Sequence, residues 1–98
     1  MNLKFNANAL CAAEQALKKP FIEIASELES EAGPALSTLR ALLAAGIASA
    51  KWGDFVTVAM DEAEAGRLID QHGVDAVALE VGKALREYFV TVGLARGN

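Results

Sequence analysis

The chain has 98 residues, of which 53% are hydrophobic and 22% are charged, and its formal net charge is −4. This length fits one domain, and this composition excludes intrinsic disorder. A disulfide-dense scaffold is excluded too, because Cys11 is the only cysteine. The 9 basic residues form no basic stripe of the kind that binds DNA or RNA. We therefore expect a single helical domain over residues 1–98 that binds no nucleic acid.

No targeting segment is evident. The opening Met-Asn-Leu-Lys-Phe lacks the basic cluster and apolar run of a signal peptide. The longest apolar stretch, residues 41–50, has about half the length that spans a bilayer. A cytoplasmic location without membrane binding is the expectation.

The chain opens with an alternating pattern. Leu3 and Phe5 alternate with polar residues, which predicts a short strand or an extended arm. The only weak strand partner is the segment 55–58. The arm is expected either to pair with that segment or to pack as extended chain.

Two helices are predicted next. Asn6 or Asn8 can cap a first helix over residues 8–19, whose apolar residues recur at helical spacing. Pro20 suits the first position of a second helix over 21–31, where its missing N–H is no loss.

The third helix is predicted over residues 37–50, with Ser37 as its N-cap. It is apolar nearly all round, which is typical of a central helix. Leu43 on this helix, and Val81 further along the chain, are predicted to be buried.

The remaining chain predicts two more helices. Residues 51–60 show little helical pattern and are expected to form a connection. Asp61 and Glu64 then form a capping box that opens a helix over 61–72. Gly73 is a natural C-cap residue, and the clearest helical periodicity in the chain follows over 74–93. The predicted fold class is all-α, a compact bundle of about five helices with a short N-terminal extended arm.

Candidate catalytic groups are few. Cys11 and His72 lie on different predicted helices and lack a third, orienting partner, so a buried thiol and a helix-end imidazole are the preferred interpretation. The acidic segment 61–70 lacks the ligand spacing of zinc and calcium sites. We expect no catalytic site, no metal and no cofactor. Gly46, Gly66 and Gly82 fall inside predicted helices, which favours a role in close helix–helix approach.

Trp52 and Phe55 lie in the predicted connection. Such aromatics usually attach a loop to the core, and the alternative is an exposed anchor for a partner. With Leu3 and Phe5 of the arm, they are the candidate partner-binding residues.

Three segments together carry a family resemblance: LKFNANALC at residues 3–11 followed by Glu14, STLRALL at 37–43, and EAGRLID at 64–70. In order and spacing they resemble the small tail protein of gene transfer agents and related prophages of α-proteobacteria. That family is grouped with phage tail assembly chaperones and is sometimes labelled a tail tube protein. The resemblance covers roughly residues 3 to 90, although the segment 52–60 is longer than the family pattern.

The resemblance implies a non-enzymatic protein of the bacterial host cytoplasm that binds a tail tube or tape-measure protein. Tube walls are built from paired strands, and this chain has at most two short ones, so an accessory chaperone is favoured over a tube subunit. A second copy of the chain is a further candidate partner. The alternatives are a small helical DNA-binding or regulatory protein and a small enzyme centred on Cys11.

Overall fold

The computed structural model describes residues 1–92, which contain helices and no β-strand. The five longest helices are α1 (Ala7–Leu17), α2 (Phe21–Glu29), α3 (Leu36–Trp52), α5 (Glu62–His72) and α6 (Val74–Val92). A 3-10 turn, η1 (Gly53–Phe55), and a short helix, α4 (Val56–Ala59), connect α3 to α5. The predicted all-α fold with five principal helices is confirmed. The predicted bounds differ from the observed ones by about two residues at most, and residue 93, where the last helix was predicted to end, lies outside the described residues.

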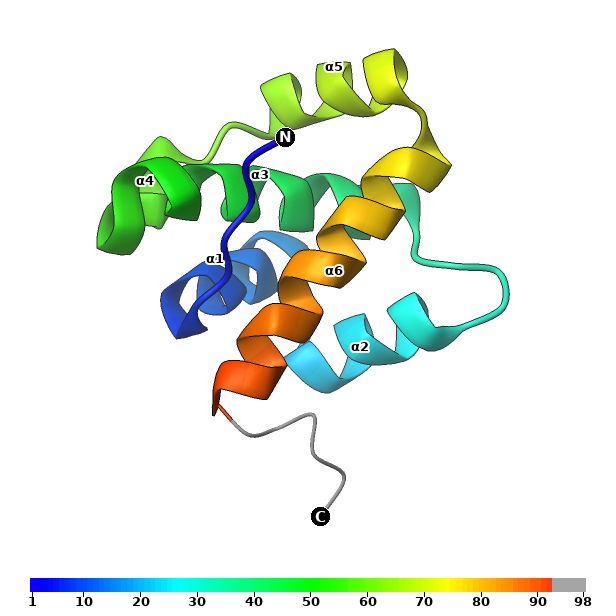
Figure 1. Ribbon diagram of the computed structural model, residues 1–98, viewed down its shortest axis with the longest axis horizontal. Coiled ribbons are helices and arrows are strands. Elements are labelled where there is room, and N and C mark those ends of the chain that lie inside the picture. The colour runs from blue at the N-terminus through cyan, green and yellow to red at the C-terminus, as the bar shows by residue number, and fades with distance from the viewer. Residues whose placement is uncertain (93–98) are drawn as a thin grey trace.

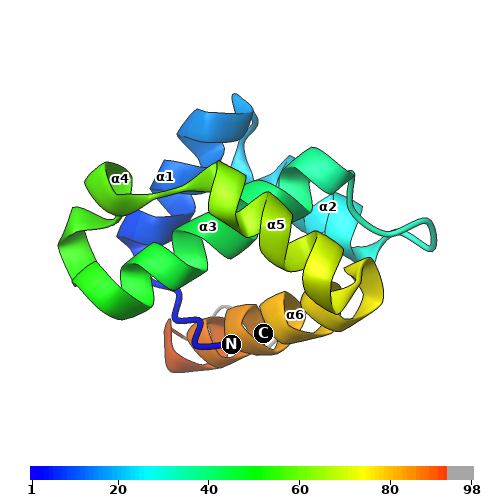
Figure 2. The same ribbon diagram turned by 90° about the horizontal axis from the view of Figure 1, so that it is seen from above.

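Helix α3 is the centre of the domain. It contacts α1, α4, α5 and α6 (Figure 1). Seen from above, α1 and α6 lie on opposite sides of α3 (Figure 2). The helix is surrounded because it is apolar on nearly every face.

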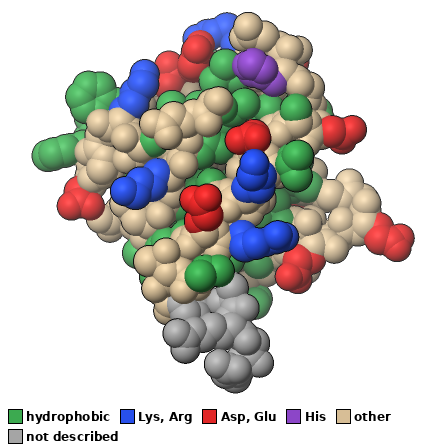
Figure 3. All heavy atoms as spheres, in the orientation of Figure 1, with side chains coloured by type: hydrophobic (Ala, Val, Ile, Leu, Met, Phe, Trp, Pro, Cys, Tyr) green, Lys and Arg blue, Asp and Glu red, His purple; other side chains and the backbone are tan. Residues whose placement is uncertain are grey.

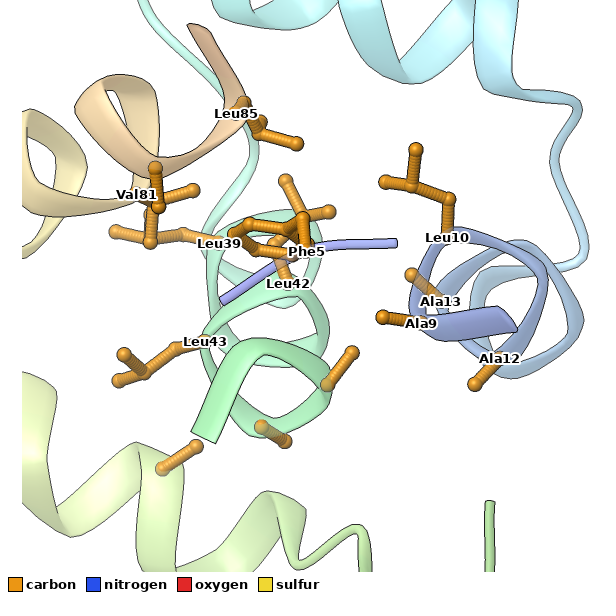
Figure 4. Packing of buried hydrophobic residues seen from close by; sticks show 14 of the residues in the cluster. Phe5, Ala9, Leu10, Ala12, Ala13, Leu39, Leu42, Leu43, Val81 and Leu85 are labelled. Carbon is orange, nitrogen blue, oxygen red and sulfur yellow. The ribbon is translucent and has the colours of Figure 1, made fainter. Parts of the chain in front are cut away.

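One cluster of buried side chains forms the core, and α3 contributes the largest share of it. Leu43 and Val81 are fully buried, as predicted. Figure 4 shows leucines of α3 between alanines of α1 and the two α6 residues Val81 and Leu85. The small side chains of α1 allow that helix to approach α3 closely.

Two predicted caps are present. The Asn6 side chain accepts a hydrogen bond from the Ala9 N–H at 2.8 Å, and Asp61 accepts one from the Glu64 N–H at 3.0 Å. The predicted capping box is only half formed, because the Glu64 carboxylate binds Arg67 instead of reaching back to Asp61. The prediction of Ser37 as the N-cap of the third helix is wrong, because α3 begins at Leu36 after Ala35.

A carboxylate from another helix serves the start of α3 instead. Glu27 of α2 accepts hydrogen bonds from the Ala35 N–H at 3.0 Å and from the Thr38 hydroxyl at 2.7 Å. Lys19 forms an ion pair with the same carboxylate. The Lys19 ammonium, the Ala35 N–H and the Thr38 hydroxyl lower the pKa of Glu27 from 4.5 to about 2. These partly buried side chains link the segment after α1 and the end of α2 to the start of α3.

The segment 51–60 differs from the expectation of a connection with little helical pattern and a weak strand candidate at 55–58. Residues 51 and 52 extend α3, and η1 and α4 follow, so both expectations are wrong. A helix of only four residues is too short to show a 3.6-residue period, so its sequence pattern does not reveal it. By length and composition alone the helical stretch Leu36–Ala59 could cross a membrane. Half of its most apolar 18-residue segment is buried inside this domain, as in a core helix.

The N-terminal arm is extended and packs on α3. Gly46 was expected to allow the close approach of another helix. The segment that approaches this glycine is the arm instead, so that expectation is wrong. Gly66 does face a neighbouring helix, with Arg40 Cδ 3.6 Å from where a Cβ would lie. No described neighbour lies within 4 Å of the equivalent point at Gly82.

Candidate functional site

Three large apolar side chains project from one end of the domain. Trp52 is 57% exposed, Phe55 is 69% exposed and Val58 is 87% exposed. We call these three residues the apolar tip. Figure 3 shows hydrophobic side chains projecting at the left edge, over the region of α4 in Figure 1. The interpretation that Trp52 and Phe55 attach the connection to the core is therefore wrong.

The local backbone explains why these side chains point outward. Helix α3 ends where Gly53 adopts a φ of 59°, a value that favours glycine. The chain then turns through η1 into α4, and Val56 is the residue that turns into the core, with no exposed surface. Since Val56 takes the buried position, its neighbours Phe55 and Val58 remain on the outside. Asp54 holds the turn against α1 through a 2.8 Å hydrogen bond from the Asn8 side chain.

A cavity of about 180 Å³ lies beside the apolar tip, with Trp52 in its lining. Apolar residues of α3 and α4, Ile47 among them, line it together with the charged residues Lys51, Asp61 and Glu64. Such a mixed apolar and charged lining suits a protruding side chain of another protein.

The structure separates the four candidate partner-binding residues. Phe5 is only 5% exposed and belongs to the core cluster, and Leu3 is half-buried against it. Trp52 and Phe55 are the two that lie on the surface, at the end of α3. Val58 was not among these four residues, because its exposure depends on α4, which is too short to show a helical period in the sequence.

The candidate catalytic groups are exposed. Cys11 is at the surface of α1, and His72 is exposed at the end of α5. The expectation of a buried thiol is therefore wrong. Within residues 1–92, no three His, Cys, Asp or Glu side chains lie close enough to hold a metal ion together.

A second hollow, of about 400 Å³, lies between α3 and α5. Arg40 and Arg67 line it, and each pairs with a carboxylate of α5: Arg40 with Glu62 at 3.5 Å and Arg67 with Glu64 at 2.7 Å. These pairings reduce the positive charge that the arginines present to a ligand.

Comparisons with known proteins identify no relative. No protein-family model, no curated protein and no solved structure matches the chain.

Proposed function

We propose that the chain is a non-enzymatic tail assembly chaperone of a phage or gene transfer agent. In this proposal it binds a tail tube or tape-measure protein and covers that protein's aggregation-prone surface until assembly. The resemblance of residues 3–11, 37–43 and 64–70 to the tail protein family supports the class. The observation that carries a binding role is the apolar tip.

The apolar tip has the properties of a binding anchor. Trp52 and Phe55 are large, aromatic and more than half exposed, although each could bury substantial apolar area. Aromatic residues of this kind contribute most of the energy in many interfaces. Val56 and the Asn8–Asp54 hydrogen bond hold the turn in place, so little conformational freedom is lost when a partner binds.

The DNA-binding alternative receives less support. Arg40 and Arg67 both have carboxylate partners, and the net charge of the chain is −4. Phosphate binding depends on unneutralised basic side chains.

Co-expression with a tail tube protein and with a tape-measure protein of the same phage or gene transfer agent, followed by pull-down, tests the proposal. We expect the wild type to capture one of them. The double variant Trp52→Ser, Phe55→Ser should capture about tenfold less or worse, as the loss of two hot-spot residues predicts. Ile22→Ser is the matched control, because Ile22 is 75% exposed on α2.

Capture of neither tail protein by the folded wild type would falsify the chaperone proposal. Equal capture by the wild type and the folded double variant would instead show that the apolar tip is not the contact surface. Circular dichroism of each variant establishes that it is folded.

A further inference from the structure

The N-terminal arm lies across α3 as an extended segment (Figure 1). The Lys4 N–H donates a hydrogen bond to the Gly46 carbonyl at 3.2 Å. Leu3 and Phe5, on either side of Lys4, direct their side chains to the protein, while Lys4 remains exposed. The arm therefore contacts α3 as a bound peptide does, with alternate side chains buried.

Gly46 makes room for this segment. A Cβ at this position would lie 3.0 Å from Cζ of Phe5 and 3.3 Å from Cδ2 of Leu3, which is too close for an undisturbed fit. Glycine within a helix costs about 1 kcal/mol relative to alanine. The missing Cβ at Gly46 thus leaves a space on α3 that the two apolar side chains of the arm fill, and we call this space the groove at Gly46.

Few backbone hydrogen bonds hold the arm, and burial of Phe5 and Leu3 supplies most of its attachment. The Lys4–Gly46 bond is its one backbone hydrogen bond to α3 within the described residues. A cavity of about 160 Å³ remains between the arm and α6, lined in part by Phe5, Tyr88 and Glu87. Asn6 joins the arm to α1 in extended conformation, and its capping bond to Ala9 involves no residue of the arm. The arm can therefore leave the groove while α1 stays capped.

We propose that the groove at Gly46 is a peptide-binding site whose resident occupant, the arm, is displaceable. The partner protein inserts an extended segment of the form apolar–basic–apolar. The apolar residues take the places of Leu3 and Phe5. The basic residue takes the place of Lys4, which lines the same cavity as Glu87. The identity of the partner rests on the proposed function, whereas the site itself does not.

A labelled synthetic peptide with the sequence of residues 1–6 tests the site. It is titrated into full-length wild type and into full-length Phe5→Ser, with fluorescence anisotropy as the readout. The tethered arm competes at an effective concentration in the millimolar range. We therefore expect Phe5→Ser, whose own arm is weakened, to bind the peptide about tenfold or more tightly than the wild type does.

Two controls define the site. A peptide with serine in place of both apolar residues should not bind. Adding Gly46→Ala to Phe5→Ser places a Cβ in the groove and should weaken binding of the original peptide about tenfold. If Phe5→Ser does not fold, Lys4→Pro, which removes the hydrogen-bond donor together with the lysine side chain, takes its place with the same expected result.

Two results would overturn the proposal. One is a folded arm variant that binds the peptide no more tightly than the wild type does. The other is peptide binding that Gly46→Ala leaves unchanged. Either result would show that the groove is not a peptide-binding site. Continued capture of a tail protein by the wild type would then leave the proposed function intact.

Discussion

Individual residues in this domain are best understood through the groups that they contact. Glu27 illustrates this, because one carboxylate receives hydrogen bonds from Lys19 after α1, from the Ala35 N–H before α3 and from Thr38 in the first turn of α3. Its low pKa reflects how strongly these donors favour the charged form.

Glu27→Gln should lower the free energy of unfolding at pH 7 by about 1–2 kcal/mol, because the charge that pairs with Lys19 is lost. The pKa of Glu27 is lowered on folding, so its contribution is complete above pH 4.5 and is lost as pH falls toward about 2. Urea unfolding at several pH values measures this. The difference between wild type and variant should shrink on acidification, and a constant difference would contradict the assignment.

Leu43→Ala should reduce the free energy of unfolding by about 2–5 kcal/mol, because it leaves a cavity beside fully buried neighbours. Glu29→Ala serves as the comparison, and the exposed position of Glu29 predicts a change within about 0.5 kcal/mol. Urea unfolding of both variants gives the two values. Small and equal losses would mean that α3 is not the centre of the core.

At the scale of elements, the helix ends are stabilised by two different means. Side chains immediately before α1 and α5 cap those helices, which is a local arrangement. The start of α2 instead receives a carboxylate from another helix: Glu14 of α1 accepts the Phe21 N–H at 2.6 Å. The start of α3 receives Glu27 in the same way. These two helices therefore depend on tertiary contacts for their first turns.

This difference leads to a prediction about caps. Asp61→Ala should destabilise the protein by about 1 kcal/mol, because the Glu64 N–H loses its acceptor. Ser37→Ala should change the free energy of unfolding by about 0.5 kcal/mol or less, because Ser37 is inside α3 and does not cap it. Thermal unfolding of the two variants measures both changes in stability. A larger loss of stability in Ser37→Ala than in Asp61→Ala would contradict our assignment of the caps.

At the scale of the whole molecule, the core residues stabilise the fold and a separate set of exposed residues is available for binding. Helix α3 contacts α1, α5 and α6, while its last residue and the segment after it carry the apolar tip on the surface. The arm closes the groove on α3 at Gly46. A partner could thus contact the apolar tip without disturbing the central packing, whereas entry into the groove replaces the core contacts of Phe5.

For the whole molecule we also predict that the exposed thiol and imidazole are dispensable. The double variant Cys11→Ser, His72→Ala should capture the tail protein as the wild type does, within about twofold, because neither side chain contributes to the apolar tip. Pull-down with quantified capture provides the measurement. Loss of capture by the folded double variant would point to a role for one of these residues in function.

The amino-acid sequence by itself determined the helices and much of the core. Repeated apolar spacing over nine or more residues identified α1, α2, α3, α5 and α6, because a helical period needs several turns to become visible. Caps formed by adjacent residues, such as Asn6 and Asp61, were predictable for the same reason: the donor and the acceptor are close in sequence.

Only the tertiary structure decided the candidate site. That Val56 is buried while Trp52 and Phe55 are exposed depends on a 3-10 turn and one turn of helix, which are too short for a periodic signal. The place of the arm on Gly46 depends on two segments about 40 residues apart in sequence, and the pattern of either segment alone does not identify its partner. Long-range packing decides where the arm lies, because burial of Leu3 and Phe5 requires a groove that exists only once α3 and α6 have assembled.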